Sequence, residues 1–543
     1  MTMAATAGGV RTGGMTAEER KVIFASSLGT VFEWYDFYIY GTLGVFLAKY
    51  FFANVPPNVG FIFALLAFAA GFAVRPFGAL IFGRLGDMIG RKYTFLITMT
   101  LMGVGTFFIG LIPGYGTWGI AAPIVLILLR LVQGLALGGE HGGAATYVAD
   151  HAPKDKRGYY TSWIQTTATL GLFLALLLIL GIRTWQGEET FGDWGWRVPF
   201  LLSGILLIIS IWIRLSLNES PVFQKMKDEG RTSKRPLTEA FGTWSNAKIA
   251  ILALFGATAG EAVVWYGGQF YALFFLTQTI KVAAVPAQIM IVVALALGTP
   301  FFVIFGILSD KIGRKPIILA GFLLAAVTYF PIFKGITHFA NPKLEAALNA
   351  SPVTVIADPS ECSFQFKATG TEKFTTSCDV AKSALVTASV NYNNEAAPPG
   401  TKAKVKVGEQ TLAADSPTFA KDLPAAIKAH GYPASADPND VNYVMTTVLL
   451  WLLVIYVTLV YAPIAAWLVE LFPSRIRYSG MSLPYHIGNG WFGGFLPATV
   501  FAIAAATGNI YSGLWYVVVI ATMSLVIGFL FLPETKDVDI TKT

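Results

Sequence analysis

The chain has 543 residues, of which 55% are hydrophobic and 13% are charged, and its formal net charge is +7. An average soluble globular protein carries about 25% charged residues, so this composition argues against that class and favours a helical membrane protein. Much of the Lys and Arg lies in short segments between apolar runs, which is typical of loops that face anionic lipid and argues against nucleic-acid binding.

Twelve apolar segments predict twelve membrane-spanning helices, since a bilayer requires roughly 20 apolar residues per helix. Residues 1–21 contain no apolar core of the signal-peptide type, so the first span is expected to act as its own insertion signal. The predicted spans are 22–47, 60–82, 93–112, 119–149, 159–182, 198–217, 247–278, 286–308, 317–336, 441–469, 479–506 and 510–532.

Basic residues alternate along these spans. Lys and Arg follow the even-numbered spans from the second to the tenth, whereas the loops 113–118 and 507–509 contain none. The positive-inside rule therefore predicts a plasma (inner) membrane protein with both termini in the cytoplasm. The expected fold class is an all-α membrane protein with two pseudo-symmetric six-helix bundles and a small, mostly-β extracytoplasmic insertion between helices 9 and 10. The predicted divisions are an N-terminal tail 1–21, the first bundle 22–217, a cytoplasmic linker 218–246, helices 7–9 at 247–336, the insertion 337–440, helices 10–12 at 441–532 and a C-terminal tail 533–543.

Two sequence patterns occur twice. G-x-L-x-D-x-x-G-R-K stands at Gly83–Lys92 and at Gly306–Lys315, after the second span of each half. Acid-x-x-Pro-x-x-x-Arg stands at Asp150–Arg157 and at Glu470–Arg477, after the fourth span of each half. The spacing between the two patterns is 97 residues longer in the second half, and the segment 337–440 accounts for the surplus. Matching loop motifs in two half-length repeats predict a transporter built from two related bundles.

These motifs resemble a known family. The repeated decapeptide and the stretch RLVQGLALGGEHGG at Arg130–Gly143 look like loop and span-4 signatures of the major facilitator superfamily. FEWYDFYIYG, WGWRVPF and FPSRIRYSGMSLPYHIGNGWFGG resemble its metabolite:proton symporter branch, which carries proline, betaine, citrate, 2-oxoglutarate, shikimate and similar metabolites. The resemblance covers about 20–336 and 441–533, and 337–440 is an insertion that the familiar members lack.

The doubled motif carries the predicted gate. Its glycines permit close helix packing, and a carboxylate near a helix N-terminus is favoured by the helix dipole. The resemblance implies that Asp87 and Asp310 latch neighbouring helices while the binding site faces outward. Asp150 with Arg157 and Glu470 with Arg477 are expected as further pairs, and the alternative is that these charges only anchor the topology. The predicted gating residues are Gly83, Asp87, Arg91, Asp150, Arg157, Asp310, Arg314, Glu470 and Arg477.

Ionisable residues inside the spans predict the transport site, because a charge at bilayer depth costs about 2.5–3.5 kcal/mol on insertion scales. Glu33 and Asp36 share a face of the first span, and a close carboxylate pair suits a proton carrier. The proton-coupling candidates are Glu33, Asp36 and Glu140. The substrate-binding candidates are Tyr40, Arg75, Arg130, Gln133, His141, Gln165, Tyr266, Gln269, His486 and Asn489. Three structural alternatives remain open: a pair of Arg130 with Glu140, an Arg75 that extends toward the cytoplasm, and a packed His486. The seventh span contains one further acid, Glu261, and a packed or near-surface position remains open for it.

The insertion 337–440 holds the only two cysteines of the chain, Cys362 and Cys378. An exported loop is an oxidising setting, so a disulfide between them is expected. Alternating residues in SFQFKA, ALVTASVNY and KAKVKV predict short strands, and the stretch from Ser416 predicts a helix. A flexible linker is the alternative.

The leading hypothesis is therefore a secondary active transporter that takes up a small organic metabolite, such as a mono- or dicarboxylate anion, together with a proton. The sequence has no P-loop, and nothing in it predicts an enzyme, a cofactor, a metal site or a nucleic-acid partner. The expected partners are the substrate, the proton and the lipid bilayer, with the chain acting as a monomer. The alternatives are a proton antiporter or exporter, a betaine or amino-acid symporter of the same fold, and a membrane sensor with an outer ligand-binding domain.

Overall fold

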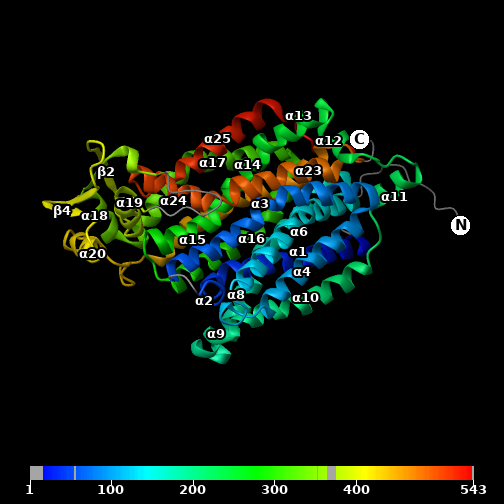
Figure 1. Cartoon of the computed structure of the whole chain (residues 1–543). Helices are drawn as coiled ribbons and strands as arrows, with labels where there is room; N and C mark the ends of the chain where they lie inside the picture. Colours follow the sequence, from blue (N-terminus) through cyan, green and yellow to red (C-terminus); the bar gives the residue numbers. More distant parts are fainter. Residues whose placement is uncertain (1–15, 54–56, 351, 364–374, 541–543) are drawn as a thin grey trace.

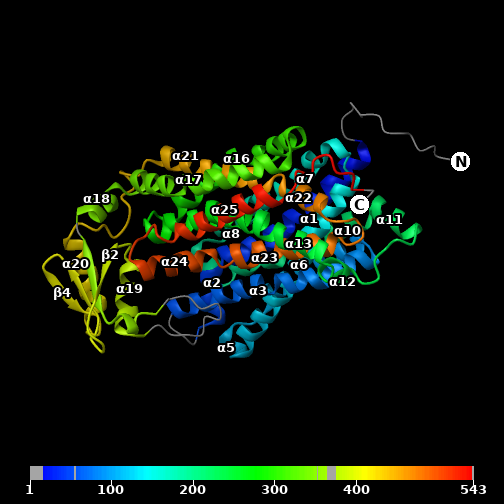
Figure 2. The same ribbon diagram turned by 90° about the horizontal axis from the view of Figure 1, so that it is seen from above.

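The computed structural model describes residues 16–53, 57–350, 352–363 and 375–540. Long helices run side by side in one elongated bundle, and a small unit with a β-sheet covers one end of it (Figure 1). The first and the last described segments of the chain lie at the opposite end of the bundle, as the view from above also shows (Figure 2). We call these the insertion end and the termini end.

The first half of the bundle contains eight principal helices. They are α1 (Ala17–Thr42), α2 (Gly44–Phe51), α3 (Pro57–Ile89), α4 (Arg91–Leu111), α6 (Ala121–His151), α7 (Arg157–Gln165), α8 (Thr167–Gln186) and α10 (Val198–Leu215). Two short helices at the insertion end, α5 (Tyr115–Trp118) and α9 (Glu188–Asp193), and two in the connecting segment, α11 (Pro221–Asp228) and α12 (Pro236–Phe241), complete this part.

The second half is also helical, and its helices contain π-helical turns. One continuous helical stretch, Trp244–Thr279, consists of α13 (Trp244–Ala253), η3 (Leu254–Thr258), α14 (Ala259–Tyr266), η4 (Gly267–Tyr271), α15 (Ala272–Phe274) and η5 (Phe275–Thr279). The other helices are α16 (Ala284–Ile312), α17 (Arg314–Ala340), α21 (Tyr443–Tyr461), α22 (Ile464–Leu471), α23 (Arg477–Ile487) with η7 (Gly488–Gly493), α24 (Leu496–Thr507) and α25 (Leu514–Phe531). Such π turns are frequent at functional sites.

Ten helical stretches of the described residues are long and apolar enough to cross a membrane. They correspond to ten of the twelve predicted spans. The remaining two, α1 and α3, pack within the same bundle, α1 against α8 and α10 and α3 against α6 and α23. Helix α1 buries Glu33 and Asp36, whose charges lower its hydropathy. The count of twelve spans, the two-fold symmetry and the domain limits remain predictions.

The insertion is a mixed α/β unit, so the prediction that it is mostly β is wrong. Four strands form a sheet in the order β2-β1-β3-β4, with β1 and β2 parallel and the other neighbours antiparallel. Helices contribute more residues than strands. The elements are α18 (Pro342–Ala350), β1 (Val353–Ala357), η6 (Pro359–Glu361), α19 (Ser377–Thr387), β2 (Tyr392–Ala396), β3 (Lys404–Val407), β4 (Gln410–Ala413) and α20 (Phe419–Ala429).

Local periodicity explains which predictions for the insertion succeeded. In KAKVKV, Val405 and Val407 are buried between exposed lysines, and β3 is confirmed as a strand. Most of ALVTASVNY is not a strand, because Cys378, Ala381 and Leu385 share one buried helical face that extends α19 into it. The predicted strand SFQFKA falls largely on 364–374, outside the described residues. The helix expected from Ser416 begins at Phe419.

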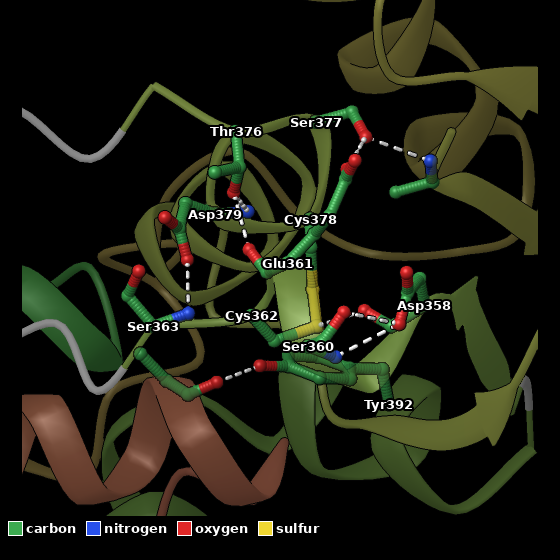
Figure 3. Close-up of a disulfide and its surroundings, with 12 residues drawn as sticks. Asp358, Ser360, Glu361, Cys362, Ser363, Thr376, Ser377, Cys378, Asp379 and Tyr392 are labelled. Atoms are coloured by element: carbon green, nitrogen blue, oxygen red, sulfur yellow. Dashed lines mark hydrogen bonds between the residues drawn. A yellow bond between two sulfur atoms is a disulfide. The ribbon is translucent and has the colours of Figure 1, made fainter. Parts of the chain in front are cut away.

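The predicted disulfide is confirmed. Cys362, just after η6, is bonded to Cys378 in the first turn of α19, with 5.2 Å between their Cα atoms (Figure 3). Asp358 lies on the same side of the sheet and accepts hydrogen bonds from the N–H groups of Ser360 (2.9 Å) and Gly400 (2.8 Å). These bonds hold the pKa of Asp358 below its usual value. The bridge joins the start of α19 to the segment after η6, and Asp358 joins η6 to the turn between β2 and β3.

Polar contacts connect the insertion to the second half of the bundle. The Tyr392 hydroxyl donates to the carbonyl of Ala505, and its N–H donates to the carbonyl of Gly508 (2.7 Å). Near the other side, Asn341 donates to the carbonyl of Ile280 (2.9 Å). The insertion therefore contacts the second half where the helical stretch 244–279 and α24 reach the insertion end.

Candidate functional site

The two copies of the decapeptide make equivalent contacts at the termini end. A Cβ at Gly83 would lie 2.9 Å from the Cα of Ser479, and one at Gly306 would lie 2.5 Å from the Cβ of Ser162, so each glycine permits close packing against the other half. The second glycines, Gly90 and Gly313, have φ values of 121° and 112° and form the turn before the next helix.

The two motif aspartates each cap a helix of the opposite half. Asp87 accepts hydrogen bonds from the N–H groups of Tyr478 (3.2 Å) and Ser479 (2.8 Å), in the first turn of α23. Asp310 accepts from the N–H groups of Gly158 and Tyr159 in the first turn of α7, both at 2.8 Å. Carboxylates at these positions satisfy free N–H groups and complement the helix dipoles. The helices so joined belong to different halves of the chain.

The expected pairing within the acid-Pro-Arg motif is wrong. Arg157 pairs with Glu470 (2.5 Å), and Arg477 pairs with Asp150 (3.4 Å), so each arginine reaches the acid of the other copy. The acid and the arginine of one motif lie in the same half, but each of them pairs with the opposite charge of the motif in the other half. These cross-pairs join the halves through fully buried charges.

The motif arginines complete the two clusters. Arg91 pairs with Asp150, and Arg314 pairs with Glu470 at 3.1 Å. Arg314 also pairs with Asp310 at 2.7 Å. All the predicted gating residues therefore gather at the termini end, in two related sets.

Four residues of these clusters were not predicted. Glu219 accepts from the N–H groups of Arg91 and Lys92, and Glu534 does the same for Arg314 and Lys315. The neighbouring hydroxyls donate to the cluster acids, Ser220 to Asp150 at 2.5 Å and Thr535 to Glu470 at 2.6 Å. A sequence signal existed, since Leu-x-Glu-(Ser/Thr) follows the last span of each half at 217–220 and 532–535.

A chain of polar contacts lies inside the first half. Arg130 donates to the Gln133 side-chain oxygen (2.7 Å), and Gln133 donates to the hydroxyl of Thr106 (2.7 Å). Thr106 in turn hydrogen bonds with Asp36. The Arg130 guanidinium also lies over the ring of Tyr40, 4.1 Å from its centroid. Helices α1, α4 and α6 thus hold four of the predicted site residues in one connected group.

Glu33 and Glu140 form a second buried group in the same half. Their carboxyl groups lie close enough to interact electrostatically, and two buried like charges at this separation favour a proton on one of them. Both line a small cavity together with Asp36, Ser203 and Ser210. The adjacency of Glu33 and Asp36 along α1 was the sequence signal, but the close partner of Glu33 comes from α6.

Arg214 is a further buried residue near this group that was not predicted from the sequence. It lies near the end of α10 and is only 2% exposed, and its positive charge interacts with the carboxyl groups of Glu33 and Glu140. Its guanidinium lies over the ring of Phe95 and donates to the carbonyl of Ser26 at 3.4 Å. The position was overlooked because an arginine at the end of a span also suits a topological anchor.

The second half contributes fewer charges to the interior. Glu261 on α14 accepts a hydrogen bond from Asn489 at 2.9 Å and is fully buried. His486 is buried one turn before Asn489, and neither ring nitrogen has a hydrogen-bond partner among the described residues. The acid of this half is therefore held by an amide and not by an arginine.

Aromatic contacts join the halves at mid-height. His141 stacks on Tyr485 with ring centroids 3.9 Å apart, and the Tyr485 hydroxyl lies 3.0 Å from that of Tyr461. The side chain of Gln165 donates to the backbone carbonyl of Tyr461 at 3.0 Å. Residues of both halves thus meet around Tyr461.

A larger set of rings continues this contact. Trp34 lies against Trp265 (5.3 Å), and Phe72 lies against Tyr266 (5.8 Å). Arg75 lies over the Phe72 ring at 4.4 Å, and Gln269 is buried on η4. Tyr266 and Gln269, two of the predicted substrate-binding residues, therefore lie in or beside this group of rings. Within the part of the chain that the structure describes, no three His, Cys, Asp or Glu side chains are placed to share a metal ion.

The chain is similar to several known proteins. A proline/betaine transporter of Escherichia coli (strain K12) is 36% identical over 321 residues, which is 58% of this chain and 64% of that protein. An alpha-ketoglutarate permease of the same organism is 34% identical over 323 residues, covering 59% and 72%. A Haemophilus influenzae protein whose name refers to metabolite transport is 31% identical over 525 residues, covering 95% of each chain. The match to the proline/betaine transporters therefore spans less than two thirds of their length.

Solved structures show the same fold. The proton:xylose symporter XylE bound to 6-bromo-6-deoxy-D-glucose superposes with a TM-score of 0.63 at 14% identity, over 97% of this chain and 98% of that one. The partially occluded, inward-open XylE from E. coli gives a TM-score of 0.57 at 15% identity, covering 96% and 99%. The family profile described as "Sugar (and other) transporter" matches residues 21–261 and 424–543. The chain therefore belongs to the sugar (and other) transporter family of the major facilitator superfamily.

Proposed function

We propose that this protein is a proton-coupled secondary transporter that takes up a small organic metabolite with a carboxylate group. The observation that carries the proposal is the buried group of Arg130, Asp36, Glu33 and Glu140 inside the first half. Charges at this depth are retained where they bind ions or substrates. The family and the names of the relatives agree with transport as the general activity.

Arg130 is the proposed anchor for the substrate carboxylate. A guanidinium offers two parallel N–H donors to a carboxylate, and Arg130 is held in place by Gln133 and the Tyr40 ring. The acids beside it, Asp36 and Glu33, are the proposed proton carriers. Substrate and proton sites that share one polar network can influence each other's occupancy, which is the requirement for coupling.

The termini end is proposed to be the cytoplasmic gate, closed in this structure. Asp87 and Asp310 hold the first turns of α23 and α7, and the cross-pairs of Arg157 and Arg477 join the halves. Opening toward the cytoplasm requires these contacts to separate. The basic loops after the even-numbered spans support the cytoplasmic assignment, and the insertion is then extracytoplasmic.

A zwitterionic substrate such as proline or a betaine is the second candidate. The rings of Trp34, Trp265, Phe72 and Tyr266 gather at the centre, and aromatic faces attract quaternary ammonium groups. In this case Arg130 binds the carboxylate and the rings surround the cation.

The test is flux into proteoliposomes that contain the purified full chain. Radiolabelled alpha-ketoglutarate, shikimate, proline and glycine betaine are each supplied under an imposed inward proton gradient, with and without a protonophore. Gradient-driven accumulation of one compound is expected. Accumulation that is unaffected by the protonophore contradicts proton coupling, and binding without flux of any compound favours the sensor. Accumulation driven by an outward proton gradient favours the antiporter.

Arg130→Lys tests the assigned contact. Lysine keeps the charge but not the two parallel donors, so the compound found above should bind at least about 10-fold more weakly. Arg183→Gln is the control, because Arg183 is exposed and pairs with Glu188 at the surface. Wild-type affinity in Arg130→Lys contradicts the assignment.

A further inference from the structure

Two small cavities lie within the first half. The first is lined by Glu33, Asp36, Glu140 and Ser210, among others. The second is lined by Lys92, Phe95, Tyr147, Arg214 and Leu217 and lies nearer the termini end. Ser210 is one turn from Arg214 on α10, so this helix borders both cavities.

The Arg214 side chain lines the second cavity and lies close enough to Glu33 and Glu140 to interact with their charges. A Cβ at Gly29, one turn before Glu33 on α1, would collide with the guanidinium, so the group lies directly against α1. Its Nε and Nη1 have no hydrogen-bond partner among the described residues. A buried guanidinium with free donors is costly unless a negative charge is close.

The second half has no equivalent of this arrangement. Matching the acid of the acid-Pro-Arg motifs, Asp150 with Glu470, places Val460 opposite Glu140. Matching Glu219 with Glu534 places Phe529 opposite Arg214, and Phe529 is 64% exposed. The set of Glu33, Glu140 and Arg214 is therefore not repeated in the second half. It is separate from the repeated motifs, whose contacts join the two halves at the termini end.

We propose that Arg214 is a positioning residue for proton release, which sets the charge state of the Glu33–Glu140 pair and separates that pair from the second cavity leading to Lys92. This inference rests on the proposed proton coupling. When the shared proton leaves, the free donors of Arg214 pair with the carboxylate that forms. The proton then passes toward the termini end within the first half, away from Arg130, where the substrate carboxylate is proposed to bind.

The charged and titratable groups around this site come from every helix packed against it. Glu33 and Asp36 lie on α1, Arg75 on α3, Lys92 on α4, Glu140 and Tyr147 on α6, and Tyr478 on α23. Lys92 donates to the carbonyl of Leu215 at 3.2 Å and is partly exposed. Arg75 is the other buried cation close to Glu33, so variants at Arg214 alone leave one positive charge nearby.

The test is a pH titration of the buried carboxyl groups by infrared difference spectroscopy, with the full chain in lipid nanodiscs. Glu33→Gln, Glu140→Gln and the double variant identify the relevant carboxyl band. In Arg214→Met, this band should persist to a pH at least about 1 unit higher than in the wild-type protein, because a nearby cation favours the carboxylate. Arg214→Lys should give a smaller displacement, since the positive charge remains. In the double Gln background, Arg214→Met should change nothing further in this band.

The result that overturns the proposal is the same titration midpoint in wild type and Arg214→Met, both with unchanged elution and thermal unfolding. If Arg214→Met does not fold, the uncharged Arg214→Gln takes its place, and an unchanged midpoint there overturns the proposal. Failure of the proposed function is seen separately, as absent gradient-driven uptake by wild type, and leaves the infrared result intact. Arg183→Gln serves as the control, since its exposed pair with Glu188 lies far from these groups.

Discussion

The two ends of the bundle are joined in different ways. At the termini end, buried charges cross from one half to the other, as in the pairs of Arg157 with Glu470 and Arg477 with Asp150. At the insertion end, the insertion makes its contacts through Tyr392 and Asn341 with carbonyl groups of the second half. The termini end therefore joins the two halves, whereas the described contacts of the insertion are with the second half.

The energetic character of the two ends also differs. Glu470 is a buried anion that accepts from Arg157, Arg314 and Thr535, and removing it would leave two buried cations. The insertion is held together by a disulfide, a sheet and exposed pairs such as Lys343 with Asp437. Substitutions at the termini end are therefore expected to change the conformational equilibrium, and those in the insertion only its local stability.

The largest effect is expected for Glu470→Gln. Breaking a buried ion pair by removing one partner costs about 3–5 kcal/mol, and here the cost falls on the closed arrangement of the two halves. Spin labels on the termini ends of α7 and α23 should show a wider distance distribution by electron–electron double resonance. Glu239→Gln is the matched control, because the pair of Glu239 with Arg475 is partly exposed and should change little. An unchanged distribution in Glu470→Gln would show that this end does not couple the halves.

The disulfide comes second. Replacing both Cys362 and Cys378 by Ser should lower the local stability of the insertion by roughly 3 kcal/mol, the chain-entropy value for a loop of about 15 residues. Hydrogen exchange of the β1 and α19 amides should become faster, while exchange in α7 and α23 stays unchanged. Intact mass after alkylation should reveal two thiols only upon reduction. Free thiols without reduction would contradict the bridge.

The two motif aspartates should differ from each other. Loss of a helix-capping carboxylate costs typically about 1 kcal/mol. Asp310→Ala should exceed this value, because Asp310 also pairs with Arg314 at 2.7 Å, and Asp87→Ala should remain near it. The same spin-label distances provide the measurement. Equal effects of the two substitutions would mean that the extra ion pair contributes nothing.

A small, pH-dependent effect is expected at Lys343. Its hydrogen bonds to Asp440 and Asp437 raise the pKa of Lys343, and the same contacts lower the pKa of Asp437. The contribution of Asp437 is present above its unfolded pKa and is lost as pH falls through its lowered folded pKa; that of Lys343 is lost only at strongly alkaline pH. Between about pH 5 and pH 2 the wild-type insertion should lose slightly more thermal stability than Lys343→Ala. Parallel curves would show that this exposed pair is without effect.

The smallest effect on flux is expected from removal of the insertion itself. Replacing 340–438 with a short Gly/Ser linker should leave measurable uptake, since the insertion makes its described contacts with one half and contributes none of the paired motifs. Correct assembly is checked by size-exclusion elution and by the termini-end distances. Complete loss of uptake in a folded variant would show that the insertion takes part in transport.

The sequence by itself determined the membrane class, ten of the spans, the doubled decapeptide and the disulfide. These follow from short-range information, namely apolar length, motif spacing and the presence of two cysteines in one segment. The same reasoning placed Asp87, Asp310 and the motif arginines at one end of the molecule. Burial inside the bundle was also foreseen for Arg130 and Glu140, because charged residues inside a span seldom face lipid.

Only the tertiary structure decided which charges meet. Asp150 and Arg477 are 327 residues apart, and spacing within one motif could not show that partners are exchanged between the halves. The approach of Glu33 to Glu140, and of Arg214 to both, depends on how α1, α6 and α10 are rotated against one another. In the insertion, the burial of Cys378, Ala381 and Leu385 on one face stabilises α19 as a helix. The alternation of apolar and polar residues in part of this segment was also compatible with a strand. In each case the deciding interaction is long-range, since side-chain packing between distant segments selects among local conformations of similar energy.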